Sequence, residues 1–273
     1  MDISSSAYRE VLHRIETAIQ LVRPIFDRFA AGTIETEYKA GHDPVTEVDR
    51  AVDAVLRESL LREDEGWLSE ESSDDLSRLS RNHVWVVDPL DGTREFVAGI
   101  PEFCVSIGFV ENGRPLAGGI YNPATQEEFL GAIDCGVLYN GRPARASQRT
   151  TLQGALVLAS RSEVNRGEWN QFMNDECRIQ PLGSVAYKLA LVAAGLADIT
   201  FTLIPKNEWD VAAGAALVES AGGIVSMLDG SRLMANRRRP LLPGLLASGP
   251  FLKEPLFTLL NAHIAAAKQA RRC

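Results

Sequence analysis

The spacing of apolar residues changes near residue 150, and this change constrains the fold more than any other feature of the chain. Before it, strand-like segments at residues 103–110, 116–121 and 128–132 follow one another across short polar turns, as in an antiparallel meander. After it, strand-like and helix-like segments alternate. We therefore expect an α/β (α+β) protein with one domain over residues 1–150 and a second over residues 151–273.

The helices are predicted from apolar positions that recur every three or four residues. Residues 7–31 show this period and should form an amphipathic helix that ends at Gly32, and residues 47–62 should form a second helix. Further helices are predicted at 165–174, 184–194, 209–220 and 250–270, with strands at 155–159, 178–180, 198–202, 224–227 and 245–248. A strand at 84–87 is apolar throughout, so we expect it to be buried.

Composition argues against several kinds of partner. The chain has 28 basic and 36 acidic side chains, a net charge of −8, which disfavours binding to a nucleic-acid polymer. No segment approaches the roughly 20 apolar residues that span a bilayer, and the first residues lack the pattern of a signal peptide. We therefore expect a cytoplasmic protein without a membrane partner. Its scattered cysteines and histidines do not predict a zinc site or thiol chemistry.

Two aspartates directly follow the predicted strand 84–87, in the run DPLDGT at residues 88–93. Ligand sites in α/β folds usually lie at the carboxyl ends of strands. Across a tight turn Asp88 and Asp91 can converge on one cation, and the Leu90 carbonyl can point the same way. The amides of Gly92 and Thr93 would open a short helical segment, and a helix N-terminus attracts anions. Each aspartate alone is equally well explained as a turn or cap residue, but the run predicts adjacent cation and phosphate sites.

Other acids also stand where predicted elements begin or end, and each has a structural explanation of its own. Glu70 could lie in a solvated loop, Asp210 could favour a helix N-terminus, and Asp49 could complete a capping box with Thr46. Taken together, the acids form an oxygen-only ligand set that suits Mg²⁺: Glu70, Asp88, the Leu90 carbonyl, Asp91 and Asp210. Because like charges raise one another's pKa, we expect two or three ions to accompany them.

Four runs together resemble the inositol monophosphatase family of magnesium-dependent, lithium-sensitive phosphatases. They are DPLDGT at 88–93, EES at 70–72, VTEVD at 45–49 and WDVAAG at 209–214. The resemblance implies a layered αβαβα sandwich and a homodimer. It also implies that one Mg²⁺ is held by Glu70, Asp88 and the Leu90 carbonyl, and a second by Asp88, Asp91 and Asp210.

The resemblance further implies a mechanism. Thr93, supported by Asp49, would orient and deprotonate the attacking water, with Glu70 also in a catalytic role. The amides of Gly92 and Thr93 would bind the phosphate, and Asp210 would contribute to substrate binding. Hydrolysis would be direct and in line, without a phosphoenzyme. The partner would be a small phosphorylated metabolite.

The substrate class is less clearly indicated. Leu203 stands where inositol monophosphatases usually carry a glutamate that binds ring hydroxyls. The run TREF at 93–96 is more similar to that of bacterial 3'(2'),5'-bisphosphate nucleotidases, and Ser160, Arg161 and Lys188 favour the same assignment. Arg161 or Lys188 could meet a second phosphate or be a surface charge.

We therefore favour a nucleotidase that converts 3'-phosphoadenosine 5'-phosphate to AMP and phosphate. The alternative is an inositol-1-monophosphatase. A non-catalytic regulatory protein that binds metal or phosphate is the alternative of another class, and the presence of the Thr93 and Asp49 pair argues against it.

Overall fold

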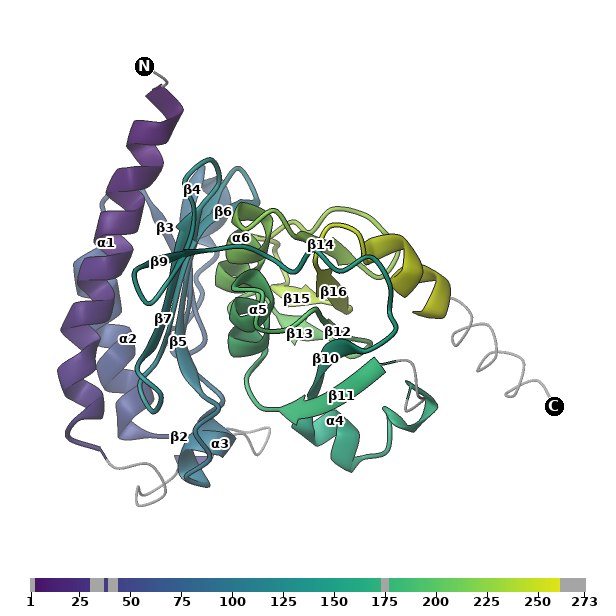
Figure 1. The fold of residues 1–273 in the computed structure, drawn as a ribbon. Coiled ribbons are helices and arrows are strands. Elements are labelled where there is room, and N and C mark those ends of the chain that lie inside the picture. The colour runs from purple at the N-terminus through teal and green to yellow at the C-terminus, as the bar shows by residue number, and fades with distance from the viewer. Residues whose placement is uncertain (1–2, 30–36, 39–43, 173–176, 261–273) are drawn as a thin grey trace.

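The computed structural model describes residues 3–29, 37–38, 44–172 and 177–260, which form five successive layers of helices and sheets (Figure 1). Helices α1 (Ile3–Phe26) and α2 (Glu47–Leu60) cover the outer face of a first sheet. Helices α5 (Val185–Ala193) and α6 (Ala212–Ser220) lie between this sheet and a second one. Helix α4 (Arg161–Asn165) and a helix that includes residues 253–260 lie beyond the second sheet. The expected αβαβα sandwich is confirmed.

The first sheet has seven strands in chain order, and all its neighbouring pairs are antiparallel except the first, which is parallel. The expected meander is present and continues through two strands that the sequence did not predict, β8 and β9. The strands are β3 (Gly66–Ser69), β4 (His83–Asp91), β5 (Cys104–Glu111), β6 (Arg114–Asn122), β7 (Glu127–Ala132), β8 (Gly136–Tyr139) and β9 (Arg142–Ala144).

The second sheet has five strands in the order β11-β10-β12-β16-β14, with parallel pairs around β10 and antiparallel pairs around β16. Its members are β10 (Ala155–Ser160), β11 (Cys177–Leu182), β12 (Ile199–Thr202), β14 (Ile224–Met227) and β16 (Leu245–Ser248). Two short antiparallel pairs join β1 (Glu37–Tyr38) to β2 (Pro44–Val45) and β13 (Lys206–Asn207) to β15 (Leu241–Leu242).

Strand β4 shows how the layers are held together. Its apolar run is buried on both faces because successive side chains point to opposite sides of a strand. Trp85 and Val87 pack in the cluster beneath α1 and α2, whereas Val84 and Val86 pack against Ala212 of α6. The first sheet therefore has a helix layer on each side, which explains the continuous apolar sequence.

Helix α6 lies directly on the backbone of the first sheet. Gly108 of β5 and Gly118 of β6 are paired in register, and both face the start of this helix. A Cβ atom at Gly118 would lie 2.4 Å from the Ala213 carbonyl oxygen, and one at Gly108 would lie 2.9 Å from the Ala213 amide nitrogen. Two opposed glycines thus allow a close approach that side chains would prevent.

Some expectations about individual elements are wrong. The helix expected at 165–174 is replaced by the short α4 and a 3₁₀ turn at Asn170–Phe172 (η2), because Gly167 has a φ of +77° that interrupts the helix. Helix α1 ends at Phe26 instead of near residue 31, and its expected stop at Gly32 lies outside the described residues. The last helix is described only to residue 260.

The division into domains at residue 150 stays a prediction. All strands of the first sheet come from residues 66–144 and all strands of the second from residues 155–248. However, α5 and α6 share one apolar cluster with both sheets.

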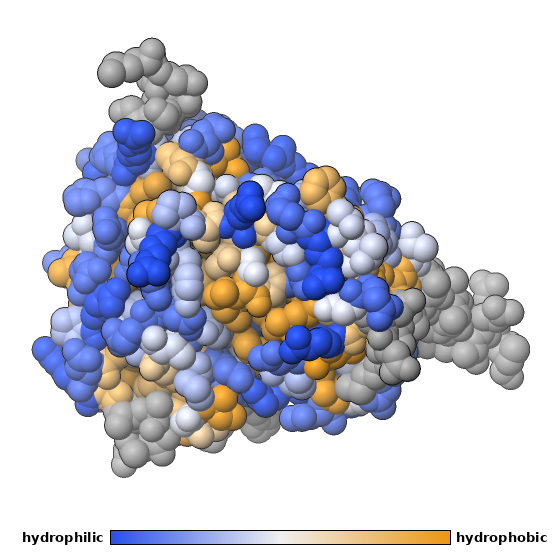
Figure 2. Space-filling view, in the orientation of Figure 1, coloured by the Kyte–Doolittle hydropathy of each residue, from blue (hydrophilic) through white to orange (hydrophobic). Residues whose placement is uncertain are grey.

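Figure 2 shows a mostly hydrophilic face with an apolar area toward its centre. Among the described helices, none is both long enough and apolar enough to cross a bilayer.

The close contact between α6 and the sheet leads to a stability prediction. Gly118→Ala should destabilise the protein by about 1–3 kcal/mol, because the added methyl group has no space beside the Ala213 carbonyl. Urea unfolding measures this change. The control is Leu138→Ala on the exposed part of β8, expected to change the free energy of unfolding by less than about 0.5 kcal/mol. Equal stability of Gly118→Ala and wild type would contradict the packing argument.

Candidate active site

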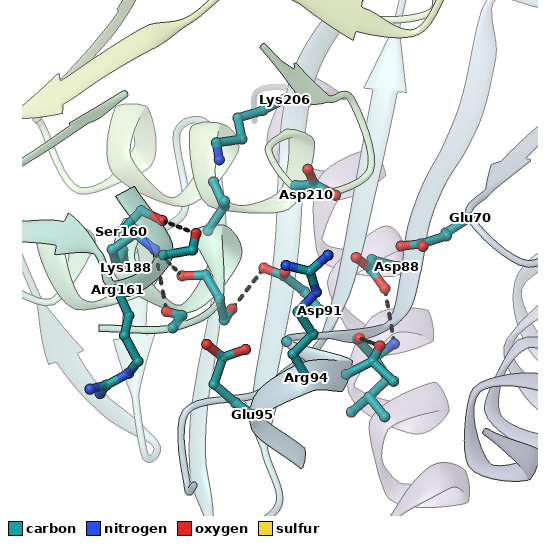
Figure 3. Close-up of a pocket in the computed structure, with 17 residues that line it drawn as sticks. Glu70, Asp88, Asp91, Arg94, Glu95, Ser160, Arg161, Lys188, Lys206 and Asp210 are labelled. Atoms are coloured by element: carbon teal, nitrogen blue, oxygen red, sulfur yellow. Dashed lines mark hydrogen bonds between the residues drawn. The ribbon is translucent and has the colours of Figure 1, made fainter. Parts of the chain in front are cut away.

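Three acids from distant parts of the sequence converge at one end of the first sheet. One carboxylate oxygen each of Glu70, Asp88 and Asp210 lies within 4.8 Å of the others (Figure 3). Asp88 is only 2% exposed. The three side chains therefore form a compact oxygen-lined cluster, as the sequence predicted.

The pleat of two parallel strands explains this convergence. Leu68 of β3 pairs in register with Val86 of β4, and both point toward α6. The same alternation, continued by two residues, brings Glu70 and Asp88 to that face. The amide of Glu70 donates to the Val87 carbonyl at 3.3 Å, which keeps the chain beside β4 after β3 ends.

Asp210 enters the cluster from the turn that precedes α6. Its Oδ2 accepts a hydrogen bond from the Asn207 amide at 3.1 Å. Because α6 is seated on Gly108 and Gly118, the position of this turn is fixed relative to β4 and β5. The close contact of α6 with Gly108 and Gly118 therefore also determines where Asp210 lies.

Asp91 lines the same pocket but is held from another direction. A register shift in β4 separates it from Asp88. Its Oδ2 accepts hydrogen bonds from Ser184 Oγ at 2.7 Å and from the Ala186 amide at 2.6 Å, both at the start of α5. Ser184 has a left-handed φ of +49° that brings its side chain to this position. Asp91 thus joins the two halves of the chain at the pocket.

The Thr93 hydroxyl lies between two acceptors. Its Oγ1 is 3.2 Å from Asp49 Oδ1 and 3.0 Å from the Leu90 carbonyl oxygen. Asp49 Oδ2 accepts from both the amide (2.7 Å) and the hydroxyl (2.6 Å) of Thr46, which completes the capping box of α2. The capping interpretation and the contact with Thr93 are therefore both correct for the same aspartate.

Gly92 allows the chain to turn from β4 into the short helix α3 (Thr93–Val97). Its φ is +99°, and a Cβ atom there would lie 2.8 Å from the Glu102 carbonyl oxygen. Only glycine fits both restrictions. Leu90, Gly92 and Thr93 line the pocket with the acids.

Burial and mutual repulsion disturb the ionisation of the acid cluster. Burial raises the pKa of Asp88 well above its ordinary value, and the charges of Glu70, Asp91 and Asp210 raise it further. The pKa of Asp210 is raised well above its ordinary value by burial and by Asp91 and Glu70. Buried carboxylates that repel one another are stabilised by a hard cation, so the donor set fits Mg²⁺.

In the neighbouring acids Asp91 and Asp49, hydrogen bonds only partly offset the rise in pKa that burial causes. The pKa of Asp91 is raised by burial, although its bonds to Ser184 and Ala186 and the charge of Lys188 lower it. Burial also raises the pKa of Asp49 against its bonds to Thr46 and Thr93.

The opposite wall of the pocket is basic and hydroxylic. Ser160, Arg161, Lys188 and Lys206 line a cavity of about 250 Å³ together with the acids (Figure 3). Arg161 is turned toward Glu102, and its Nη2 donates to Glu102 Oε2 at 2.6 Å. Ser160 Oγ lies 3.0 Å from Ser162 Oγ. The residues expected to bind substrate therefore border the pocket, but Arg161 already pairs with a carboxylate.

Lys188 is buried and bonded to backbone. Its Nζ donates to the carbonyls of Leu182 (3.3 Å), Gly183 (3.3 Å) and Ser184 (2.7 Å). Burial lowers its pKa to about 8. It therefore contributes positive charge beside the pocket while its donors hold the loop before α5.

Sequence reasoning missed Lys206, which lies in β13 four residues before Asp210 and lines the pocket. Its Nζ is 3.2 Å from Oε1 of the buried Glu163, and in Figure 3 the ammonium group points toward Ser160 and Lys188. A basic residue so close to the WD motif was the available signal. Leu203, by contrast, packs in the apolar cluster beyond the second sheet.

A buried arginine outside the pocket connects the segments that carry Glu70 and Asp210. Arg78 is fully buried and donates to Asp74 Oδ2 (2.8 Å), Asn236 Oδ1 (2.7 Å) and the Arg237 carbonyl (3.0 Å). Glu208 accepts from the amides of Asn236 (2.7 Å) and Arg237 (3.0 Å). The loop after Glu70 is thus linked to the residue two positions before Asp210.

The repulsion in the acid cluster yields a prediction for metal-free protein. Asp88→Asn should raise the melting temperature at pH 7.5, because it removes a buried charge and keeps an oxygen to accept from the Leu90 amide. Each kcal/mol of relieved repulsion is worth roughly 2–4 °C for a chain of this size.

The stability of the metal-free protein should depend on pH in a definite direction. A folded-state pKa above the ordinary 3.8 means that the unfolded chain releases its proton first, so stability falls as pH rises from about 4. The advantage of Asp88→Asn should therefore shrink toward pH 4, as measured by thermal unfolding in a chelating buffer with Asp64→Asn on the surface as control. A lower melting temperature than wild type at pH 7.5 would refute the argument.

Comparison with known proteins agrees with this geometry. The sequence matches the inositol monophosphatase family over residues 8–267. It is 34% identical over 242 residues to inositol monophosphatase 3 of Solanum lycopersicum, covering 84% of this chain and 88% of that protein. It is 37% identical over 210 residues to an inositol-1-monophosphatase of Mesorhizobium japonicum, covering 74% and 78%.

The fold is similar to that of a Thermotoga maritima IMPase, with a TM-score of 0.79, 28% identity and coverage of 93% of this chain and 99% of that one. The family match spans nearly the whole sequence, and the relatives are matched over most of their length. The chain therefore belongs to the inositol monophosphatase family, whose members are phosphatases that hydrolyse phosphomonoesters.

Proposed function

We propose that this chain is a Mg²⁺-dependent phosphomonoester hydrolase in which water attacks phosphorus directly. The observation that carries the proposal is the acid cluster of Glu70, Asp88 and Asp210 in the same pocket as the hydrogen-bonded Thr93 and Asp49. A metal-binding or phosphate-binding regulatory protein would need the cluster but not this pair.

The oxygen donors suit two or three Mg²⁺ ions. Glu70, Asp88 and the Leu90 carbonyl would hold one ion, and Asp88, Asp91 and Asp210 would hold a second. When bound, the ions supply a hydroxide nucleophile near neutral pH and stabilise charge on the leaving oxygen.

Thr93 and Asp49 can orient a water molecule and accept its proton. If the Thr93 hydroxyl donates to Asp49 Oδ1, its lone pairs are free to accept a hydrogen bond from water in the pocket. Asp49 Oδ2 is held by Thr46, so the carboxylate cannot rotate away. The pair thus fixes the direction of proton transfer, and Glu70, which lines the same pocket, would be the third catalytic residue.

The phosphate group would lie between the acid cluster and the basic wall. The amides of Gly92 and Thr93 would donate to its oxygens at the start of α3, and Asp210 would contact the substrate from the α6 side. Lithium inhibition, a homodimer and a cytoplasmic location belong to this proposal as expectations from the family.

For the substrate we favour a bisphosphorylated nucleotide, as in 3'-phosphoadenosine 5'-phosphate. The pocket wall carries Ser160, Arg161, Lys188 and Lys206, and the apolar Leu203 packs away from it. The names of the relatives support inositol 1-phosphate equally well. Both substrates place a phosphate beside a hydroxylated ring, so direct comparison is required.

The central test is phosphate release from 3'-phosphoadenosine 5'-phosphate, inositol 1-phosphate and fructose 1,6-bisphosphate, with and without Mg²⁺. Asp91→Asn should lower kcat at least about 100-fold by weakening the metal site, while the folded state remains. Circular dichroism checks the fold, and Ser80→Ala on the surface is the control. Wild-type turnover by Asp91→Asn, or turnover without a divalent cation, would exclude the proposed mechanism.

Substrate preference can be tested through Lys206. Lys206→Met should raise KM for 3'-phosphoadenosine 5'-phosphate about tenfold and leave KM for 3'-AMP within about twofold, because only the bisphosphate places a second anion near this ammonium. Steady-state kinetics on both nucleotides measures the difference. Lys253→Met, on the helix beyond the second sheet, serves as control. Equal changes in both KM values would remove Lys206 from the specificity argument.

A further inference from the structure

We infer that Asp53 is a positioning residue that holds Glu70 in place for metal binding. Asp53 lies on α2 one turn after Asp49, and only 9% of it is exposed. Its Oδ1 accepts a hydrogen bond from Ser69 Oγ at 2.5 Å, and its Oδ2 accepts one from Ser72 Oγ at 2.6 Å. Sequence analysis gave no role to this residue.

The two serines stand on either side of Glu70 and Glu71. Ser69 Oγ also accepts from the Glu71 amide at 3.2 Å, so one aspartate and one serine together fix the start of the loop. Ser72 fixes its end. Hydrogen bonds to an ionised carboxylate are among the stronger ones in proteins, so the bonds from Ser69 and Ser72 to Asp53 restrain the loop more than bonds between neutral groups would.

Asp53 acts through the loop rather than on the pocket itself. Both of its oxygens already accept from serine hydroxyls, and it is absent from the residues that line the pocket. Helix α2 is in turn anchored by Val52 and Leu56 in the apolar cluster between the first sheet and helices α1 and α2. The loop that carries Glu70 is therefore held in a fixed position relative to α2.

The same helix also positions the residue that would activate water. Asp49 and Asp53 are four residues apart and so lie on one face of α2. Asp49 contacts Thr93, and Asp53 holds the segment that carries Glu70. A single helical turn therefore sets the separation between the proposed water-activating group and the proposed metal ligand.

Such a restraint matters because of the repulsion within the acid cluster. The backbone bond from Glu70 to Val87 keeps the chain beside β4, but repulsion by Asp88 and Asp210 acts on the Glu70 side chain. Without the contacts to Asp53, each binding event would have to order the loop after Ser69 again. Loss of groups that orient metal ligands typically costs about 10–100-fold in metal affinity. The inference rests on the proposed function only in taking Glu70 as a metal ligand.

The experiment compares Asp53→Asn with Glu58→Gln, which makes the same change of charge on the exposed face of α2. Asn retains one acceptor oxygen but replaces the other with an amide donor, so one serine must reverse its hydrogen bond and both bonds lose their charge-assisted character. Mn²⁺ binding is measured directly by electron paramagnetic resonance, and Mg²⁺ activation is measured on the wild-type enzyme's best substrate.

We expect Asp53→Asn to raise the Mn²⁺ dissociation constant and the half-activating Mg²⁺ concentration at least about tenfold. At saturating Mg²⁺, kcat should recover to within about threefold of wild type and KM should stay within about twofold, which a general loss of structure would not allow. Glu58→Gln should match wild type in every measurement.

Ser72→Ala provides an independent variant if Asp53→Asn does not fold. It should weaken Mn²⁺ binding in the same direction, and the double variant should lose less than the sum of the two effects because both act through one contact. Mn²⁺ affinity within twofold of wild type in Ser72→Ala and in any folded Asp53→Asn would overturn the inference. Weakened Mn²⁺ binding in a protein that hydrolyses none of the phosphate esters would instead overturn the proposed function alone.

Discussion

Mutual repulsion among buried carboxylates is the constraint on which the pocket depends. Glu70, Asp88 and Asp210 approach within 4.8 Å of one another, and the pKa values of both aspartates are raised by burial and by their neighbours. No local preference of the chain would gather these charges. They are brought together because β3, β4 and α6 are held by large apolar layers on either side, so the stability of the layers offsets the cost of the cluster.

Short-range patterns predicted the mixed α/β class and the positions of the acids, whereas the layered sandwich was implied by the resemblance to the family. The apolar run before Asp88 indicated a buried strand, and the DPLDGT and WD runs indicated where ligands would emerge. The helix expected at 165–174 was wrong because the positive φ of Gly167 ends α4 before the apolar period does. The apolar residues Trp169 and Phe172 that suggested the helix instead pack against Phe201. Tertiary contacts there override the helical pattern.

The contacts that orient the acids could not be predicted, since they join residues far apart in sequence. Lys206 pairs with Glu163, and Ser184 binds Asp91 from a left-handed backbone conformation that no local pattern announces. Lys188 was expected either at a substrate phosphate or on the surface; it lines the pocket, and its ammonium donates to the carbonyls of Leu182, Gly183 and Ser184. Which acceptors a lysine ammonium binds depends on the fold around it, so composition and spacing alone could not predict the partners of Lys188.

The buried Arg78 has a consequence for comparing related chains. Its guanidinium connects the loop after Glu70 to Asn236 and Arg237, which Glu208 joins to the turn carrying Asp210. None of these connecting groups lines the pocket. Two homologues with identical acid motifs can therefore differ in how rigidly the segments that carry Glu70 and Asp210 are held together. That difference would depend on whether an arginine stands at the position of Arg78, outside the acid motifs.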